Sequence, residues 1–193
     1  MVSHSLVLGY HGCDVRVARK VILREDALHP SQNPWDWLGH GYYFWEDSPA
    51  RAMQWAVNES QRRGGKIEHP AVLGAVIDLG NCLNLADAEA LGQVRTAHDE
   101  YERFCKSAGV EMARNRGLDL RARYLDCAVM ESLHEFRREE EKPAFDTVRG
   151  FFIEGKELYP NAGFRELDHI QICVRSLGQI IGFFWPRQFT AIN

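Results

Sequence analysis

The chain has 193 residues, of which 45% are hydrophobic and 26% are charged, and its formal net charge is −4. This length and composition predict one globular domain, residues 1–193, with a core of its own, and they exclude an intrinsically disordered protein. The acidic balance offers no broad attraction to phosphate backbones, which disfavours a dedicated nucleic-acid binder.

Cysteine usage and hydropathy indicate a cytoplasmic protein. The five cysteines are odd in number and far apart, with no CxxC pair, so they predict neither a disulfide framework nor a zinc site. The first residues lack the basic and apolar regions of a signal peptide, and no run reaches about 18 apolar residues. We therefore expect a protein of the reducing cytoplasm, without a bound metal and without a membrane span.

Apolar runs and turn residues predict three strands and two helices in the first part of the chain. Residues 11–13 are expected to form a turn between the first strand and the first helix. Asp47 or Ser48 can cap the second helix, and Pro49 suits its first turn. The predicted strands are Ser5–Tyr10, Tyr42–Trp45 and Ala71–Leu79, and the predicted helices are Val15–Leu23 and Ala50–Asn58.

Two amphipathic helices follow, at residues 88–107 and 120–141, and they form an insertion of about residues 86–142 between strands. Asp87 caps the first helix, which ends near Gly109. The remaining predicted strands are residues 148–153, 169–174 and 179–185. Because helices do not alternate regularly with strands, this order predicts an α+β fold with largely antiparallel strands.

Three short segments stand outside the packing pattern: Tyr10-His11-Gly12, the run GHGYYF at residues 39–44, and residues 169–174 followed by Gln179. In this order and spacing they resemble the signature segments of ADP-ribosyltransferases of the diphtheria-toxin and poly-ADP-ribose-polymerase type, which place His, Tyr and Glu on three strands. Each segment alone is a weak signal, and their specificity comes from the combination. The resemblance covers about residues 5–60 and 148–187, and it implies split antiparallel β-sheets with a helical insertion.

The resemblance also implies that NAD is the substrate, and it gives a role to particular residues. His11 would bond the adenine-side ribose, and the backbone of Gly12 would hold the nicotinamide carboxamide. Tyr43 would stack on the nicotinamide beside the strand entry that Gly41 shapes, and Trp55 would form the opposite wall. These parts suit a dry slot in which an oxocarbenium-like charge develops.

Gln171 stands where the family has its catalytic Glu. A carboxamide can bond the ribose hydroxyl, but it has no charge to stabilise a cation and is no strong base. Losing one such electrostatic group costs about 3 kcal/mol of transition-state stabilisation, or about 100-fold in rate. Glu166, Asp168 and His169 are candidate substitute bases, and His169 ranks first because it lies two residues from Gln171 on the same strand face.

Several other residues have two readings. Trp35 and Trp37 either pack or cover the slot, and single arginines are usually solvated, although one of them can meet a pyrophosphate. The histidines and cysteines on the two inserted helices are expected to be structural. The arginines are Arg51, Arg149 and Arg165, the histidines are His98 and His134, and the cysteines are Cys105 and Cys127.

These observations favour an NAD-dependent mono-ADP-ribosyltransferase of a bacterial type, a toxin or defence effector that an antitoxin or regulatory protein controls. Poly-ADP-ribose elongation is not expected, because Gln171 replaces the Glu. Two alternatives remain: an NAD glycohydrolase that uses the same pocket, and a catalytically silent module that binds a partner through the insertion. The acceptor, protein or nucleic acid, stays open.

Overall fold

The computed structural model describes residues 5–117 and 120–187 and contains, within them, one sheet of seven strands. The predicted domain of residues 1–193 includes positions 1–4, 118–119 and 188–193, which lie outside the described residues. The strands are β1 (Leu6–Asp14), β2 (Tyr42–Glu46), β3 (Pro70–Asp78), β4 (Cys82–Asn84), β5 (Thr147–Phe152), β6 (His169–Val174) and β7 (Ile180–Phe184). Hydrogen bonds order them as β4-β5-β6-β2-β1-β3-β7.

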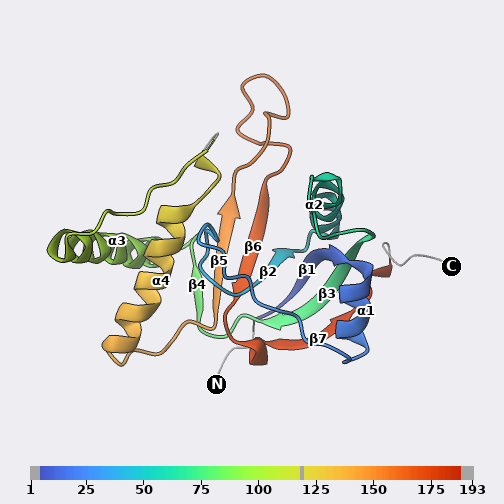
Figure 1. Cartoon of the computed structure of the whole chain (residues 1–193), viewed down its shortest axis with the longest axis horizontal. Coiled ribbons are helices and arrows are strands. Elements are labelled where there is room, and N and C mark those ends of the chain that lie inside the picture. Colours follow the sequence, from blue (N-terminus) through green and yellow to red (C-terminus); the bar gives the residue numbers. More distant parts are fainter. Residues whose placement is uncertain (1–4, 118–119, 188–193) are drawn as a thin grey trace.

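Two pairs of helices flank opposite ends of this sheet (Figure 1). Helices α1 (Val15–Ile22) and α2 (Pro49–Gln61) contact β1 and β3, whereas α3 (Ala88–Ala108) and α4 (Tyr124–Glu139) pack on each other beyond β4. The Asp87 side chain accepts hydrogen bonds from the N–H groups of Glu89 and Ala90, so it caps α3 as predicted. Gly109 ends α3 in the left-handed conformation with φ 66°.

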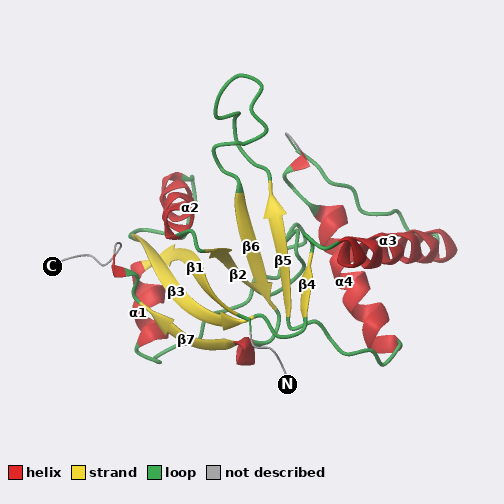
Figure 2. Cartoon of the chain, turned by 180° about the vertical axis from the view of Figure 1, so that it is seen from behind, coloured by secondary structure: helices red, strands yellow, loops and turns green. Residues whose placement is uncertain are grey.

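The predicted α+β class is confirmed, but the expected split antiparallel sheets are replaced by one mixed sheet. β4 is a short strand that the sequence reading missed, and it pairs parallel to β5. Parallel neighbours need a crossover connection, and α3 and α4 lie between β4 and β5 in the chain. The helical insertion is therefore this crossover, seen from behind in Figure 2.

Two predicted boundaries differ most from the structure, each for a local reason. The predicted turn at residues 11–13 is strand, because β1 pairs with β3 as far as Asp14. The second inserted helix begins at Tyr124 instead of Leu120, since Leu120 has a left-handed φ of 53° and Ala122 exchanges backbone hydrogen bonds with Arg116. A helix cannot include a residue whose peptide groups are committed to such a bridge.

The pairing between β1 and β2, at the middle of the sheet, is short. The register between β1 and β2 consists of Gly9 opposite Glu46 and Tyr10 opposite Trp45. A Cβ on Gly9 would lie 2.5 Å from Ile77 Cδ1 and 2.8 Å from Phe44 Cβ, so this junction requires glycine. Beyond Tyr10 the two strands diverge, and the divergence forms part of the candidate site below.

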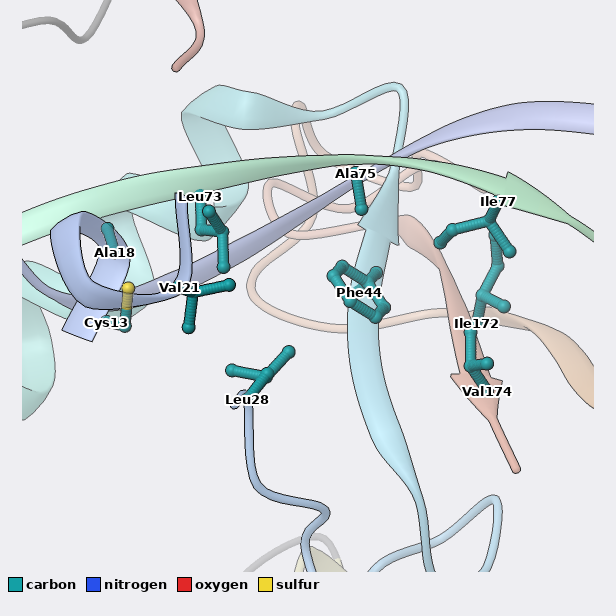
Figure 3. Close-up of a cluster of buried hydrophobic side chains, with 10 residues drawn as sticks. All are labelled: Cys13, Ala18, Val21, Leu28, Phe44, Leu73, Ala75, Ile77, Ile172 and Val174. Atoms are coloured by element: carbon teal, nitrogen blue, oxygen red, sulfur yellow. The ribbon is translucent and has the colours of Figure 1, made fainter. Parts of the chain in front are cut away.

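Two buried clusters support the halves of the sheet. The first joins β1, β3, α1 and the inner face of β2 and β6, with Phe44, Leu73 and Ile172 fully buried (Figure 3). The second packs α3 and α4 on β4 and β5 through residues such as Leu83 and Val148. Burial of apolar surface in these clusters is the main stabilising contribution to the fold.

Asp14, at the N-cap of α1, is a buried carboxylate whose removal is expected to be costly. It is buried and accepts bonds from the Arg16 N–H (3.0 Å), the Arg16 Nε–H (2.9 Å), and the Glu68 (2.8 Å) and His69 (3.0 Å) peptide groups. Asp14→Asn presents an NH₂ to these donors, and we expect it to lower the free energy of unfolding by about 2 kcal/mol in urea titrations at pH 7.

The pH dependence of this difference identifies the carboxylate as its source. Burial alone would raise the pKa of Asp14, but the bonds from Arg16, His69 and Glu68 outweigh burial and hold the pKa well below its usual range. The stabilisation is therefore present above the unfolded-state pKa of about 4 and is lost as the pH falls below it. Asp26→Asn, at a half-exposed carboxylate bonded to the Ala27 N–H, is the matched control. Equal losses in both variants would contradict the assignment.

His134 on α4 predicts a second pH effect on stability. Its Nε2 is buried without a hydrogen-bond partner among the described residues. Burial, with smaller effects of Arg175 and Arg137, lowers the pKa of His134 to about 3. The unfolded chain therefore takes up a proton near pH 6.5 that the folded chain does not, so stability falls as the pH drops below this value. Between pH 7 and 5, His134→Leu is expected to remove about 2 kcal/mol of this fall.

Urea titrations of wild type and variant at several pH values measure the change in slope. His98→Leu is the control, because the His98 side chain is 41% exposed and pairs with Asp99 at the surface. If the free energy of unfolding of His134→Leu depends on pH as steeply as that of the wild type, His134 titrates in the folded state and the expectation is wrong.

Candidate functional site

A cleft of about 480 Å³ opens where β1 and β2 diverge. It lies between α2, the segment of residues 31–37 that precedes β2, and the beginning of the long connection between β5 and β6. Of the residues predicted from the sequence, it brings together His11, Tyr43, Trp55 and Gln171. Gly12, Gly41 and His169 are not among the residues that line it.

The edge of β1 facing the divergence carries the peptide groups of Gly12. The Leu8 carbonyl accepts a bond from the Asp47 N–H (3.0 Å), which places the peptide groups of Leu8 on the β2 side of β1. Because peptide groups alternate along a strand, those of Tyr10 and Gly12 point to the same side. The pairing with β2 ends at Tyr10, so the N–H and C=O of Gly12 face the space between the diverging strands.

Gly12 is also required by close packing of α2. A Cβ at this position would lie 2.3 Å from the Ala52 carbonyl oxygen and 3.1 Å from Trp55 Cε3. No other residue fits without moving α2, so the helix that carries Trp55 lies directly against the Gly12 backbone. A ring held by that backbone would therefore meet the α2 side of the cleft.

The His11 side chain bridges the diverging strands. Its Nδ1 lies 2.8 Å from the Tyr43 carbonyl oxygen. Burial lowers the pKa of His11, so the ring is neutral at pH 7, and a proton on Nδ1 donates to the carbonyl. This tautomer leaves Nε2 as an acceptor on a ring that lines the cleft.

Tyr43 is held rigidly by its hydroxyl group, which donates to the Gly39 carbonyl (2.7 Å) and accepts from the Leu38 N–H (3.0 Å). Burial raises the pKa of Tyr43, so the phenol stays protonated. Gly41 packs on β6, since a Cβ there would lie 2.6 Å from Cys173 Sγ. Gly39 therefore holds the Tyr43 side chain through its carbonyl group, and Gly41 lets the backbone before β2 lie close against β6.

The aromatic wall on the α2 side consists of Trp55 and its neighbour Trp45. Trp55 is 38% exposed, and its ring centroid lies 5.8 Å from that of Trp45 at an interplanar angle of 45°. The Arg51 guanidinium lies over Trp45 at 6.0 Å. An exposed tryptophan beside a cleft is available to stack on a planar ligand.

Gln171, on β6, is 7% exposed and accepts a hydrogen bond from Trp37 Nε1 at 3.0 Å. Trp37 in turn stacks on Phe152 with a centroid distance of 3.8 Å. The sequence left two roles open for Trp37, packing and covering the slot. Both apply, because Trp37 packs on Phe152 of β5 and also lines the cleft. It also fixes the carboxamide of Gln171.

His169 is not placed to act as a base in the cleft. Its side chain is 1% exposed, and its Nδ1 contacts the Leu167 carbonyl at 2.6 Å. The rings of Trp37, Trp45 and Phe152 surround it at centroid distances of 6.4, 6.3 and 5.6 Å. Burial lowers the pKa of His169, so the ring is neutral. Strand alternation correctly puts it on the Gln171 face, but three aromatic rings cover it there.

Glu154 is a cleft carboxylate that the sequence reading missed. It follows β5 by two residues, and its Oε2 pairs with Arg51 Nη2 at 2.9 Å. No local pattern points to it, because Glu154 lies beyond the end of β5 and meets Arg51 of α2 only in the folded chain. Arg149, inside β5, lies on the face opposite to Phe152 and pairs with Glu46 at 2.6 Å. Of the three candidate arginines, only Arg51 lines the cleft.

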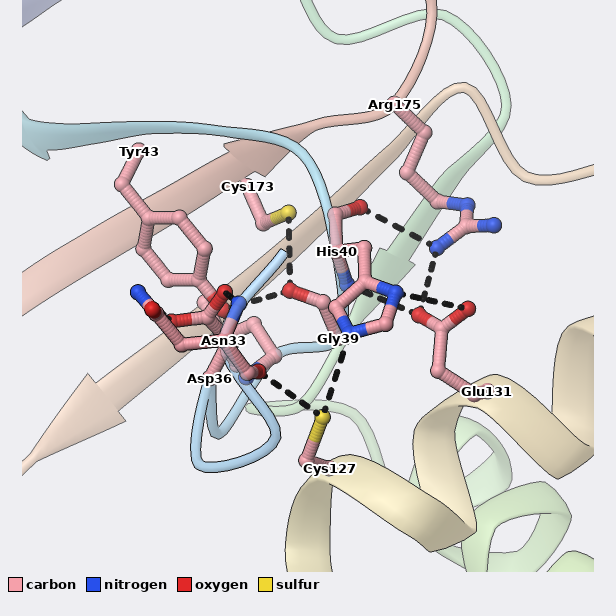
Figure 4. Close-up of polar contacts among 10 residues, drawn as sticks. Asn33, Asp36, Gly39, His40, Tyr43, Cys127, Glu131, Cys173 and Arg175 are labelled. Carbon is pink, nitrogen blue, oxygen red and sulfur yellow. Dashed lines mark hydrogen bonds and ion pairs between the residues drawn. The ribbon is translucent and has the colours of Figure 1, made fainter. Parts of the chain in front are cut away.

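A polar network joins α4 to the segment that positions Tyr43 (Figure 4). Glu131 accepts a bond from the His40 N–H (2.7 Å) and from Arg175 Nη1 (3.2 Å). Cys127 Sγ lies 3.8 Å from His40 Nε2, and burial raises the pKa of Cys127 to about 11, so it remains a thiol. The network therefore connects α4 of the crossover to the segment before β2, and it helps to hold that segment in place.

Across residues 5–117 and 120–187, no group of three or more His, Cys, Asp or Glu side chains is placed to hold a metal ion. Within the same ranges, no helix has the length and apolar character needed to cross a membrane.

No family model matches the chain, and no solved structure matches it. A segment of 77 residues, 40% of the chain, is 31% identical to an uncharacterised protein of Methanocaldococcus jannaschii and covers 35% of that protein's length. The chain thus matches only a minor part of this relative.

Proposed function

We propose that the protein is an NAD-dependent mono-ADP-ribosyltransferase with an ADP-ribosyltransferase-like fold, and that NAD is its substrate. The observation that carries the proposal is that His11, Tyr43 and Gln171, far apart in the chain, line one cleft at the divergence of β1 and β2. These are the positions that resemble the His, Tyr and Glu of the family. The backbone of Gly12 borders the same space.

The cleft residues suit the cleavage of the bond between nicotinamide and ribose. The peptide groups of Gly12 would hold the carboxamide, the rings of Tyr43 and Trp55 would enclose nicotinamide, and neutral His11 would bond the adenine-side ribose. An acceptor nucleophile then forms a bond to the ribose C1′ while nicotinamide leaves with the electron pair of the broken bond. Gln171 would orient a ribose hydroxyl, its carboxamide being fixed by Trp37.

Glu154 supplies the carboxylate that Gln171 lacks. Glu154 lines the cleft and pairs with Arg51 on one side. Its side chain is 24% exposed, so it can face a bound substrate. We propose that it receives the proton of the acceptor nucleophile. His169, the base expected from the sequence, is enclosed by rings and is not proposed for this role.

Incubation of the protein with NAD labelled in the adenosine part, together with a lysate, tests the function. Release of nicotinamide with transfer of label to a macromolecule is expected. Release without transfer would identify an NAD glycohydrolase. Absence of both release and NAD binding by calorimetry would contradict the proposal and leave a module that binds a partner.

A role as a toxin or defence effector controlled by an antitoxin forms part of the proposal. Expression in a bacterial host should then slow growth, and the slowing should require the cleft. The His11→Ala variant, expressed to the same level, is expected to permit normal growth.

A further inference from the structure

A second cavity, of about 400 Å³, adjoins the cleft on the far side of Trp37. Trp37, Arg121 and Glu154 line both spaces, so they form the wall between them. A molecule in the second cavity would thus reach Glu154, the carboxylate proposed to receive the acceptor's proton. This position suits the acceptor substrate.

Three arginines line the second cavity, and Glu154 is the carboxylate that faces them. Arg121 and Arg123 come from the segment before α4, and Arg165 comes from the long connection between β5 and β6. The cavity is therefore basic in a chain whose net charge is −4. A local concentration of guanidinium groups is typical of sites that bind phosphate.

The arginine segment before α4 is fixed in place. Ala122 and Arg116 exchange backbone hydrogen bonds of 2.9 and 3.0 Å, and Asn115 Oδ1 accepts from the Leu125 N–H at 2.8 Å. The Arg123 guanidinium lies 5.5 Å from the Trp37 ring centroid, over its face. Its Nη1 lies 3.5 Å from Asp126 Oδ2, whereas its Nε is buried and has no hydrogen-bond partner among the described residues.

Exposed aromatic rings lie on two of the segments that border the two cavities. Tyr159 and Phe164, on the same connection as Arg165, are 58% and 63% exposed, and Trp35, at the rim of the cleft, is 46% exposed. Figure 1 shows this connection projecting from the sheet between β5 and β6. Arginines combined with exposed aromatic rings favour single-stranded nucleic acid, because every base has a face that can stack.

We propose that the second cavity is the acceptor site and that the acceptor is single-stranded nucleic acid, bound through its phosphates by Arg121, Arg123 and Arg165. This proposal rests on the proposed function, since it identifies the substrate that receives ADP-ribose. It also gives the helical crossover a role, because the crossover supplies two of the three arginines. The attraction is local, because the arginines line this cavity in a chain whose net charge is −4.

Binding of a fluorescently labelled single-stranded oligonucleotide, measured by anisotropy without NAD, tests the site. Arg121→Ala combined with Arg165→Ala should weaken binding about 10-fold and lower the slope of log affinity against log salt by about 1.4, since each phosphate contact on a single strand contributes about 0.7. Arg103→Ala combined with Arg138→Ala, at two helix arginines that are 72% and 76% exposed, is the matched control. This control has the same net charge as the Arg121→Ala, Arg165→Ala variant, and it should bind the oligonucleotide as the wild type does.

Outcomes separate this inference from the proposed function. Equal weakening in both double variants, or transfer of label from NAD only to a protease-sensitive product, overturns the acceptor site and leaves the transferase proposal standing. Oligonucleotide binding with the expected salt slopes, but without nicotinamide release from NAD, supports the nucleic-acid site and contradicts the transferase. Thermal melting confirms that each variant folds before binding is compared.

Discussion

Replacement of His11 by alanine is expected to lower kcat/KM for NAD cleavage about 100-fold, the usual effect of removing one preorganised hydrogen-bonding group from a dry site. The ring bridges β1 and β2 through the Tyr43 carbonyl, and it lines the cleft that the divergence of these strands creates. Alanine removes the group proposed to contact NAD and leaves that carbonyl without its donor. The rate of nicotinamide release, measured by chromatography, checks the expectation.

The protonation state of His11 adds a pH test to this prediction. Because burial lowers its pKa, the ring is neutral above pH 6.5, and its contribution should be constant between pH 6.5 and 8. His29→Ala, at a histidine that is 82% exposed, is the control and should cleave NAD as fast as the wild type. Normal cleavage by a folded His11→Ala variant would show that the pocket has been misassigned.

The sequence predicted the elements well where a single period governed the pattern. The strands at Ala71–Leu79 and 169–174 and the helix from Ala88 were confirmed, because burial on a sheet or a helix face repeats regularly. β4 was missed because three residues are too few to show a period. The prediction of a turn at residues 11–13 was wrong, since a glycine in a strand resembles one in a turn until the helix packed against it is known.

The candidate cleft residues were predictable from the sequence only through the three signature segments. The features that the sequence did not predict, the enclosure of His169 and the place of Glu154, were missed for one reason. Alternation assigns a side chain to a face of its own strand, and it placed His169 and Gln171 together correctly. It cannot show which rings cover that face, so the enclosure of His169 by Trp37, Trp45 and Phe152 required the structure. Glu154 escaped for the same reason, because its meeting with Arg51 joins two segments that no local pattern connects.

Gln171→Glu is expected to raise the rate constant of NAD cleavage by about 10- to 100-fold, because it places a negative charge where the proposed reaction would develop an oxocarbenium-like charge. A glutamate retains an acceptor for Trp37 Nε1, so the side chain should keep its position. The site is 7% exposed, and burial raises the pKa of a carboxyl group there. The gain should therefore grow as the pH rises and the carboxyl group ionises.

Single-turnover measurements at several pH values separate this effect on the chemical step from an effect on NAD binding. Gln54→Glu adds the same charge at an exposed position of α2, where Gln54 bonds Arg51, and it controls for a general change in potential at the rim. A rate constant that rises with Gln171→Glu but not with Gln54→Glu means that charge at the Gln171 position limits the natural reaction. If Gln171→Glu folds, binds NAD and cleaves it no faster, the transition state does not form beside β6. In that case Glu154 is the carboxylate nearest the reacting bond, and Glu154→Gln should then abolish cleavage while Gln171→Leu leaves it unchanged.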